Sequence, residues 1–479
     1  MNNASKKWLD LFHKTASTVL AYKKFLKKHK INPLKIKTLK DFTKLPIINK
    51  NNYYQKYNLK DFFPKRKNPS MAYASSGSSG KPTFWFREDE QEQSGGEIHE
   101  IIFRDIFNIT KKESTLVVVC FSMGIWVAGN YTLSACRYVS NLGYNLTTIS
   151  PGIEKEDIFN ILKELAPKYD NLILAGYPSF LMDIMNEVQK RKIFIRNKKI
   201  NFIMSGDKFS ESWRKDFLNL VKIKNSHSLI NIYGSADAAI LGHETPLSIF
   251  LRKELLINKN LRQRLSGKGE DFPSIIQYYP NRIFFEEVDG ELIITSQTAI
   301  PLIRYNIHDI GRIIKYAEVK KILKICNLEK KAQKHGLFEW KLPLIILKGR
   351  TDVATTFYAL NIFPEHIKAG IENKSVKKFL TGNFMIYNKV INRNKVEKLC
   401  IRIELSKGVR PTKKNFDLIN KSIIGHLIKL NIEFRKLYQT INQKALPMVN
   451  FYKYGDKKFL AEKKPRIVGL VNKKPRKII

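Results

Sequence analysis

Residues Ala74–Thr83 carry the clearest chemical signal in the sequence, because four serines, two glycines and one lysine lie together there. Small residues let backbone N–H groups converge on an anion, hydroxyls add donors, and Lys81 adds a positive charge. Gly77 and Gly80 enclose only two residues, and Lys81 precedes Pro82. A Walker loop instead needs about four residues between its glycines and Ser or Thr after its lysine. The segment therefore predicts a different phosphate cradle, with a flexible Ser/Gly hinge as the alternative.

The same segment resembles the phosphate loop of the adenylate-forming superfamily of acyl-CoA synthetases, which reads Ser-Ser-Gly-Thr-Thr-Gly-Lys-Pro. Upstream, Leu39–Lys50 is similar to the Leu-Pro-x-x-x-Lys lead-in of the phenylacetate–CoA ligase family and its CapK-like capsule-biosynthesis relatives. The resemblance covers roughly Asn32 to Ile371. It implies a catalytic role for Lys81 and binding of the ATP phosphates by the residues that match the loop: Ser75, Ser76, Gly77, Ser78, Ser79, Gly80 and Lys81.

A second match, Asn231–Asp237, follows an expected strand and resembles the family's Tyr-Gly-x-x-Glu signature. The resemblance implies that Tyr233 stacks on adenine, that Gly234 and Ser235 line the nucleotide, and that Asp237 is a catalytic residue that helps to hold Mg²⁺. Aspartate replaces the usual glutamate and is one methylene shorter, so the contact with Mg²⁺ can become water-mediated. Without the resemblance, we would interpret Tyr233 as a core aromatic and Asp237 as a helix cap.

Two stretches near residue 300, Gly290–Thr295 and Pro301–Asp309, are similar to the family's Gly-Glu-Leu strand and Arg-Tyr-x-x-Gly-Asp turn. The resemblance implies that Asp309 binds the ribose hydroxyls, since a carboxylate can accept two O–H bonds. His308 replaces the usual glycine, so we expect an altered turn there. We give this histidine no catalytic role.

Two further matches are less specific. Gly206 and Asp207 follow an expected strand and correspond to the family's adenine wall. Phe121–Gly129 corresponds to the segment that lines the acyl pocket, where Met123 and Trp126 suit an apolar or aromatic acid. Ordinary core packing is the alternative for both stretches.

The stretch from Leu347–Asp352 through Asn361–Ile367 resembles the hinge and opening strand of the family's mobile C-terminal domain. By that resemblance Asp352 is the hinge, and Arg350 contacts the ribose or a phosphate. Relatives carry glycine where Ala359 stands, because the backbone must pass close to the pantetheine arm. A methyl group at Ala359 would narrow the passage for the thiol. We therefore expect it to impair thiol transfer more than adenylation.

Among the residues that the resemblance implies, the catalytic lysine of the C-terminal domain is assigned least specifically. Relatives carry Gly-Lys near the end of the chain, where the lysine bonds the carboxylate and the α-phosphate. This sequence has no such pair there, and we favour Lys463 as the catalytic lysine. Lys457, Lys458 and Lys464 remain candidates, and Lys463 as a surface lysine is the competing interpretation.

Short aliphatic runs alternate with helical stretches and predict a mainly parallel sheet covered by helices, whose carboxyl-end loops build the binding site. An Asp-Gly pair at 289–290 predicts a hairpin. We therefore expect an α/β fold with a large multi-layered N-terminal adenylation domain, residues 1–349, and a small mobile α+β C-terminal domain, residues 350–479. The expected strands are 115–120, 147–150, 171–175, 200–204, 229–232, 282–287 and 291–295, and the expected helices are 131–142, 155–165, 179–190, 210–220 and 411–430.

The chain of 479 residues carries 85 Lys and Arg against 43 Asp and Glu, a formal net charge of +42. The hydrophobic content of 43% excludes a mainly disordered basic protein. Of the basic residues, a nucleotide site accounts only for Lys81, Arg304 and Arg350. We attribute most of the remaining positive charge to a background bias in amino-acid composition rather than to a binding surface. The dense stretches Lys463–Arg466 and Lys473–Lys477 resemble a polyanion contact, although a solvated tail is favoured. We expect no nucleic-acid partner.

Compartment and partners follow from what the sequence lacks. Four widely separated cysteines form no metal knuckle or disulfide framework. Neither a signal peptide nor an apolar stretch long enough to span a membrane is evident, which predicts a cytoplasmic protein. A homodimer is left open.

The resemblance implies two-step activation of a carboxylic acid with ATP and Mg²⁺, followed by transfer from the adenylate to a thiol, with CoA favoured. Transfer to a carrier-protein thiol, an amine or a hydroxyl, including that of a deazaflavin cofactor, is the first alternative. A basic relative that binds polyanions and has lost catalysis is the second.

Overall fold

The computed structural model divides the chain into two compact units. Unit 1 comprises Met1–Ala74, Phe84–Gly176 and Val188–Thr351, and unit 2 comprises Ser75–Thr83, Tyr177–Glu187 and Asp352–Ile479. The predicted boundary after residue 349 and the mobility of the smaller domain stay predictions. The structure describes residues 3–63, 68–75, 83–266, 273–350, 355–358, 360–391, 396–410, 412–456, 459 and 466–468.

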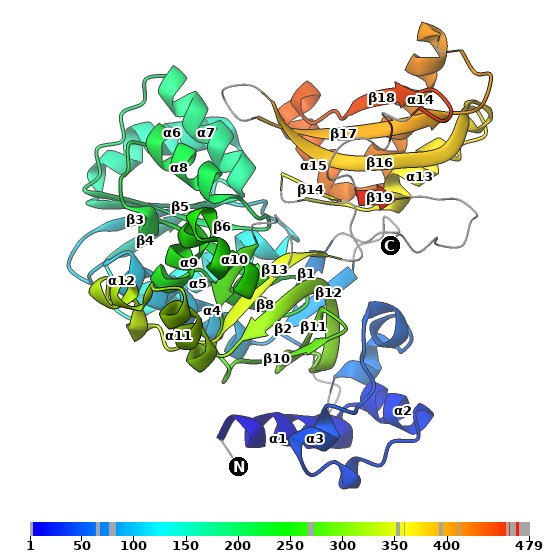
Figure 1. Ribbon diagram of the computed structural model, residues 1–479. Helices are drawn as coiled ribbons and strands as arrows, with labels where there is room; N and C mark the ends of the chain where they lie inside the picture. Colours follow the sequence, from blue (N-terminus) through cyan, green and yellow to red (C-terminus); the bar gives the residue numbers. More distant parts are fainter. Residues whose placement is uncertain are drawn as a thin grey trace. The chain divides into compact units, whose positions relative to one another are not determined.

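An eleven-stranded sheet forms the centre of unit 1 (Figure 1). The parallel part contains the strands predicted from the alternating pattern, and they are mostly buried. In sheet order these are β4 (Leu146–Ile149), β3 (Thr115–Cys120), β5 (Asn171–Gly176), β6 (Lys199–Ser205) and β7 (Leu229–Ser235). The helices between them in the chain are α5 (Val127–Asn141), α6 (Lys155–Asn160), α7 (Pro178–Lys190) and α8 (Glu211–Leu220).

The rest of the sheet is antiparallel, so the prediction of a mainly parallel sheet is wrong for the sheet as a whole. Short connections such as Asp289-Gly290 join only antiparallel neighbours. That hairpin is confirmed, with φ of 52° at Asp289 and 80° at Gly290. The antiparallel strands, in sheet order from β7, are β8 (Ala239–His243), β9 (Ser274–Gln277), β13 (Leu344–Arg350), β12 (Leu302–Ile314), β11 (Glu291–Ser296) and β10 (Ile283–Val288).

Helices at the start of the chain share one hydrophobic cluster with strands β10 to β12. Trp8, Phe12 and Phe42 pack in this cluster with Phe285 and Tyr305. The early elements are α1 (Asn3–Thr18), α2 (Leu20–Lys28), α3 (Leu39–Phe42), β1 (Met71–Ser75), β2 (Thr83–Arg87) and α4 (Asp89–Ile101). A second cluster lies among α9 (Pro246–Ile257), α10 (Lys259–Ser266), α11 (Tyr316–Ile325) and α12 (Glu329–Lys334).

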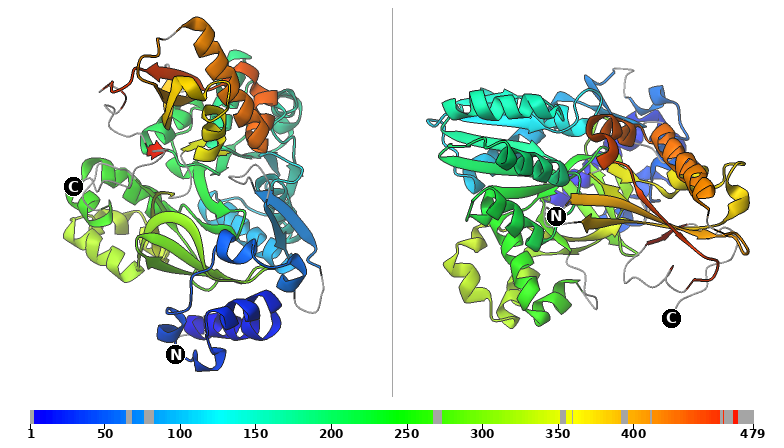
Figure 2. Two further views of the ribbon diagram at one scale, coloured as in Figure 1. Left: turned by 90° about the vertical axis from the view of Figure 1, so that its right-hand side faces the viewer. Right: turned by 90° about the horizontal axis from the view of Figure 1, so that it is seen from above.

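Unit 2 contains a four-stranded sheet with helices gathered on one side (Figure 2). The helices α13 (Pro364–Ile371) and α14 (Lys413–Leu430) approach closely, since a Cβ on Gly370 would lie 2.6 Å from the Ile423 Cα. The helix α15 (Ile432–Ile441) follows. The strands, in sheet order, are β18 (Met448–Tyr452), β17 (Val396–Leu405), β16 (Leu380–Ile391) and β19 (Arg466–Val468), with a separate pair β14 (Thr355–Phe357) and β15 (Leu360–Ile362).

Within the described part of the chain, neither a membrane-spanning helix nor a disulfide bond is present. No helix there combines the length and the apolar character needed to cross a membrane. The four cysteines are free and buried, which agrees with the prediction of no disulfide framework.

Candidate active site

The turn between β7 and β8 carries the Tyr-Gly-x-x-Asp match. Gly234 is required there, because a Cβ at this position would lie 2.9 Å from the Ala239 carbonyl oxygen. The Ser235 Oγ accepts a hydrogen bond from the Ala238 N–H at 3.1 Å, which closes the turn. No helix follows Asp237, so its alternative interpretation as a helix cap is wrong.

Asp237 is 8% exposed, and both of its carboxylate oxygens have neighbours. The hydroxyl of Tyr305 on β12 donates to Oδ2 at 2.5 Å, and Lys50 Nζ lies 3.7 Å from Oδ1. The main-chain carbonyl of Asp237 accepts a hydrogen bond from Arg87 Nη1 at 3.3 Å. Three segments far apart in the sequence therefore hold this one residue.

Tyr233 and Asp309 are brought into direct contact, with the tyrosine hydroxyl donating to Asp309 Oδ2. Tyr233 is half-buried against the cluster of the N-terminal helices, whereas Asp309 is buried. Asp309 also pairs in register with Arg350 across β12 and β13. The structure thus brings three of the predicted nucleotide residues together, on strands that are not all adjacent.

The segment that resembles an Arg-Tyr-x-x-Gly-Asp turn is an irregular part of the long strand β12. His308 has φ of 62°, and its N–H donates to Asn306 Oδ1 at 2.7 Å. A histidine at positive φ is uncommon, and a local side-chain hydrogen bond offsets part of the strain. The expected altered turn is therefore a kinked strand that carries Asp309.

Arg304, which we counted among the nucleotide-binding residues, lies instead inside the protein. Its Nε is 3.0 Å from Glu286 Oε2, and its Nη1 donates to the Leu45 carbonyl. Burial raises the pKa of Glu286, and the guanidinium of Arg304 opposes this rise. Arg304 therefore fixes the lead-in segment to β10 and β12.

The lead-in segment places Lys50, a site residue that our sequence analysis did not single out. The Ile48 N–H donates to the Arg304 carbonyl at 3.0 Å, and the Asn306 N–H donates to the Ile48 carbonyl at 2.8 Å. These bonds set Lys50 near Asp237 and 5.4 Å from the Trp85 ring centroid. The signal was present, because Lys50 is the final lysine of the Leu-Pro-x-x-x-Lys match.

Gly206 and Asp207 lie at the carboxyl end of β6, beside β7. Gly206 has φ of 89°, which glycine adopts without strain. The Asp207 carbonyl accepts a hydrogen bond from Asn231 Nδ2 at 3.3 Å, and the Ser205 hydroxyl donates to the Ile232 carbonyl at 3.0 Å. These two hydrogen bonds join the carboxyl ends of β6 and β7.

A buried ion-pair network was not predicted from the sequence. Glu244 Oε1 lies 2.7 Å from Arg214 Nη2 and also contacts Arg252 Nη1, while Glu211 lies 3.0 Å from Arg214 Nε. The Asn231 N–H donates to Glu244 Oε2 at 2.9 Å, two residues before Tyr233. Burial alone would raise the pKa of Glu244, but the two guanidinium groups hold it below its ordinary value.

The acyl-pocket segment is divided between core and surface. Phe121 and Trp126 are buried, and the Ala74 N–H donates to the Ile125 carbonyl at 2.8 Å. A Cβ on Gly129 would lie 2.5 Å from the Met123 sulfur. The burial of Trp126 fits both core packing and the lining of an acyl pocket. A separate buried cluster of Tyr73, Tyr131 and Ala239, with Val127 and Ile240 against it, lies next to the Asp237 turn.

Several predicted site residues cannot be placed. Ser76, Gly77, Ser78, Ser79, Gly80, Lys81, Asp352, Ala359 and Lys463 lie outside the described residues. Ser75 ends β1, and its hydroxyl lies 3.5 Å from the Thr83 carbonyl.

The donor set around Asp237 suits Mg²⁺ in one particular mode. Within the described residues no three His, Cys, Asp or Glu side chains gather into a metal site. Mg²⁺ is commonly held by one or two carboxylates, with substrate phosphates and water completing the shell. The single buried carboxylate of Asp237 fits that mode.

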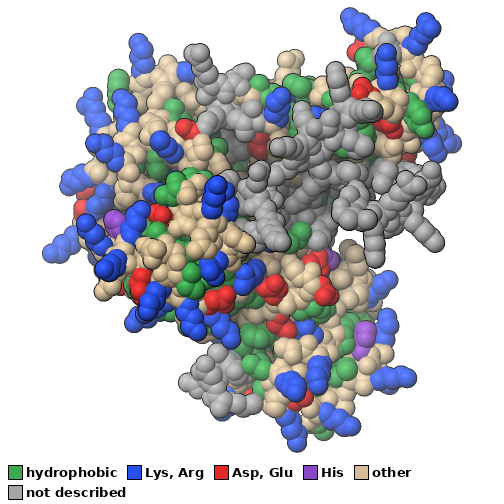
Figure 3. Space-filling view, in the orientation of Figure 1, with side chains coloured by type: hydrophobic (Ala, Val, Ile, Leu, Met, Phe, Trp, Pro, Cys, Tyr) green, Lys and Arg blue, Asp and Glu red, His purple; other side chains and the backbone are tan. Residues whose placement is uncertain are grey.

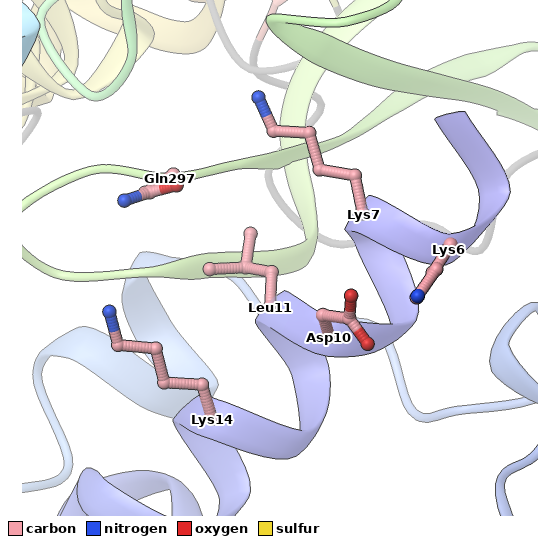
Figure 4. A pocket seen from close by; sticks show the side chains of 6 residues that line it. All are labelled: Lys6, Lys7, Asp10, Leu11, Lys14 and Gln297. Atoms are coloured by element: carbon pink, nitrogen blue, oxygen red, sulfur yellow. The ribbon is translucent and has the colours of Figure 1, made fainter. Parts of the chain in front are cut away.

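A basic hollow of about 360 Å³ lies elsewhere in unit 1 (Figure 4). Lys7, Leu11 and Lys14 project from α1 toward Gln297, and Lys7 Nζ donates to the Asn281 carbonyl at 2.5 Å. The described residues that line this hollow include no aromatic ring on which an adenine could stack.

Comparisons with known proteins favour the same family as the motifs. No family model matches the chain. It is 21% identical over 298 residues to a phenylacetate-coenzyme A ligase of Aromatoleum evansii, covering 61% of this chain and 62% of the relative. A phenylacetate-coenzyme A ligase of Thermus thermophilus is 20% identical over 356 residues, with 73% and 69% covered. The chain spans about three fifths of the length of the first of these relatives.

The fold is also that of solved acyl-CoA ligases. A 2-hydroxyisobutyryl-CoA ligase in complex with its acyl-AMP and CoA superposes with a TM-score of 0.64 at 14% identity, covering 94% of this chain and 86% of that one. The same ligase in its postadenylation state gives a TM-score of 0.53, with 94% and 85% covered. The resemblance is confirmed: this chain has the fold of a solved acyl-CoA ligase, and its sequence is similar to the phenylacetate–CoA ligases.

Proposed function

We propose that the protein activates a carboxylic acid with ATP and transfers the acyl group to a thiol, with CoA favoured. Two contacts with β12 carry this proposal: Tyr233 of β7 donates to Asp309, and Asp237 of the following turn accepts from Tyr305. Lys50 lies beside Asp237. An aromatic ring, two buried carboxylates and a cation are the groups that an adenine, a ribose and a phosphate chain require.

The chemistry has two displacements. An acid oxygen attacks the α-phosphorus of ATP, the bond to the bridging oxygen breaks, and pyrophosphate leaves. The thiol sulfur then attacks the acyl carbon, and AMP leaves with the bonding electrons. Charge neutralisation and alignment of the attacking oxygen supply most of the rate in such reactions.

Individual roles are proposed from the motif match and, for the described residues, from their contacts as well. The Tyr233 ring would stack on adenine while its hydroxyl orients Asp309. The Asp309 carboxylate would accept hydrogen bonds from the ribose hydroxyls. Lys81 and its loop would hold the phosphates, with Arg350 at the ribose or a phosphate and Lys463 at the reacting carboxylate. Mg²⁺ at Asp237 would neutralise phosphate charge.

The acid is proposed to be apolar or aromatic. Tyr73, Tyr131 and Ala239 form a buried cluster directly after the Asp237 turn, with Val127 and Ile240 packed against it. A pocket built from such side chains would favour an apolar acyl group. A CapK-like role, a cytoplasmic location and a homodimer remain part of this proposal.

The alternative acceptors differ only in the second displacement. A carrier-protein thiol, an amine or a hydroxyl would react with the same adenylate. Ala359, which replaces the glycine beside the pantetheine arm, is the reason to test these acceptors as well as CoA. The polyanion-binding alternative has less support, because basic side chains on the face shown in Figure 3 are scattered among acidic and apolar ones.

Acid-dependent exchange of labelled pyrophosphate into ATP tests the first displacement without assuming an acceptor. A panel of aromatic and aliphatic acids should reveal exchange that is lost in Lys81→Ala and Asp309→Ala. Addition of CoA should then release AMP and form a thioester. An adenylate that forms but is not discharged by CoA would favour another acceptor. Absence of exchange with every acid, together with salt-sensitive nucleic-acid binding, would favour the polyanion alternative.

A further inference from the structure

Arg87, the last residue of β2, is a fully buried arginine whose partners are backbone carbonyls. It is 0% exposed. Its Nη1 donates to the Phe86 and Asp237 carbonyls at 3.0 and 3.3 Å, and its Nη2 donates to the Ala236 carbonyl. Among the described residues, no group accepts a hydrogen bond from its Nε, and no carboxylate forms an ion pair with it.

Such an arrangement is costly for a residue with only a packing role. Burial lowers the pKa of the Arg87 guanidinium below its ordinary value. A buried charge is usually paired, and an apolar side chain of similar volume often replaces it without loss of stability. The two carbonyls that Arg87 contacts beyond its own strand both belong to the turn that carries Asp237.

The strand β2 contacts the surroundings of Asp237 through a second residue as well. Trp85 lies two positions before Arg87, and both are buried, as expected for one face of a strand. The Trp85 ring lies 6.1 Å from the Tyr305 ring and 5.4 Å from Lys50 Nζ. Tyr305 and Lys50 are the side chains that contact the Asp237 carboxylate.

We propose that Arg87 is a positioning residue that fixes the Ala236-Asp237 turn to β2, and so sets the Asp237 carboxylate for Mg²⁺·ATP. This inference rests on the proposed function. In the sequence β2 begins directly after Lys81-Pro82. The strand that leaves the phosphate-binding segment and the proposed metal ligand are therefore linked by one side chain.

Substitution by lysine separates the charge from the geometry. Arg87→Lys keeps a cation but loses the fork that reaches two adjacent carbonyls. Arg262→Lys is the matched control, because Arg262 donates to the consecutive Leu255 and Leu256 carbonyls at 2.9 Å each. Calorimetric binding of α,β-methylene-ATP over a Mg²⁺ series provides a readout that needs no acid substrate.

The expected result is that Arg87→Lys raises the Mg²⁺ concentration for half-maximal nucleotide binding roughly tenfold, the size of one lost hydrogen bond to a charged group. Arg262→Lys should leave it within about twofold, as for a distant independent site. In an Asp237→Asn background, Arg87→Lys should add no further shift. An unchanged Mg²⁺ dependence in folded Arg87→Lys, or full additivity in the double variant, would overturn the inference.

If Arg87→Lys fails to fold, amide hydrogen exchange still tests the inference. This experiment compares the wild type with Asp237→Asn, and both proteins retain Arg87. Mg²⁺·nucleotide should slow amide exchange at residues 84–87 in the wild type and slow it less in Asp237→Asn. Equal slowing in both would count against the link. Absence of nucleotide binding by the wild type would overturn the proposed function and this inference together. Nucleotide binding without acid-dependent exchange would overturn acid activation alone.

Discussion

Two carboxylates at opposite ends of β8, Asp237 and Glu244, are both buried but are held in different ways. Glu244 contacts two guanidinium groups and a backbone N–H. Asp237 has one hydroxyl at 2.5 Å and one ammonium group at 3.7 Å. Asp237 therefore retains acceptor capacity for a further cation, whereas the protein's own donors satisfy Glu244 on both oxygens.

The comparison distinguishes Glu244, whose contacts stabilise the fold, from Asp237, whose carboxylate can still bind a ligand. Glu244 anchors β7 through Asn231 and so sets the strand that carries Tyr233. Asp237 lies where the strand ends, as ligand-binding residues do in open α/β sheets. Substitutions at the two sites should consequently affect different observables.

The largest effect is expected from Glu244→Ala. Removing one partner of a buried ion pair costs about 3–5 kcal/mol where the remaining charge is left uncompensated. Without Glu244, the buried Arg214 and Arg252 would share the single carboxylate of Glu211. Denaturant unfolding should show this loss, while Glu156→Ala, at an exposed pair with Arg191, should leave the midpoint unchanged. Equal midpoints for the two variants would contradict the assignment of Glu244 to the fold.

Asp237→Ala should affect activity rather than stability. Loss of one group that stabilises transition-state charge commonly costs about 10²–10³-fold in rate, and we expect a loss near the lower figure at limiting Mg²⁺. Lys50 is partly exposed, so water can solvate the ammonium group that the substitution leaves behind. A Mg²⁺ titration of pyrophosphate exchange measures the effect. A wild-type rate at every Mg²⁺ concentration would remove Asp237 from the site.

Tyr305→Phe should give a smaller change in the same direction. It removes one hydrogen bond to the Asp237 carboxylate and keeps the ring against Trp85. A hydrogen bond to a charged group contributes about 1.5 kcal/mol, which corresponds to roughly a tenfold higher Mg²⁺ requirement. A change as large as that of Asp237→Ala would show that Tyr305 has another role.

The smallest effect is expected from pH. The pKa of Glu244 is lower in the folded protein than its ordinary value of 4.5, so its ion pairs contribute stability above that value. This contribution is lost as the pH falls below 4.5 and through the lower folded pKa. The slope of unfolding free energy against pH in this range should therefore be shallower in Glu244→Gln than in the wild type. Equal slopes would mean that Glu244 does not titrate on unfolding.

The sequence predicted the parts of the site that short motifs encode. Tyr233, Gly234 and Asp237 lie in one seven-residue match, and Asp309 lies in another, so the resemblance of short motifs was sufficient to select them as candidates. The parallel strands were also predictable, because their near-continuous apolar runs are bounded by helical stretches.

Contacts between distant segments could not be predicted in the same way. The pairing of Arg214 and Arg252 with Glu244 and of Arg304 with Glu286 depends on tertiary packing, and isolated charged residues resemble surface residues in the sequence. Apart from the predicted hairpin of β10 and β11, the antiparallel part of the sheet was not predicted, for a related reason. Its neighbours β9 and β13 are joined across helices rather than by a recognisable hairpin.

The most direct test of the account is incorporation of labelled pyrophosphate into ATP by the wild-type protein, with and without a carboxylic acid at saturating Mg²⁺. The account predicts exchange that requires the acid, and release of AMP with a thioester when CoA is added. Binding of Mg²⁺·ATP without exchange for any aromatic or aliphatic acid would contradict it.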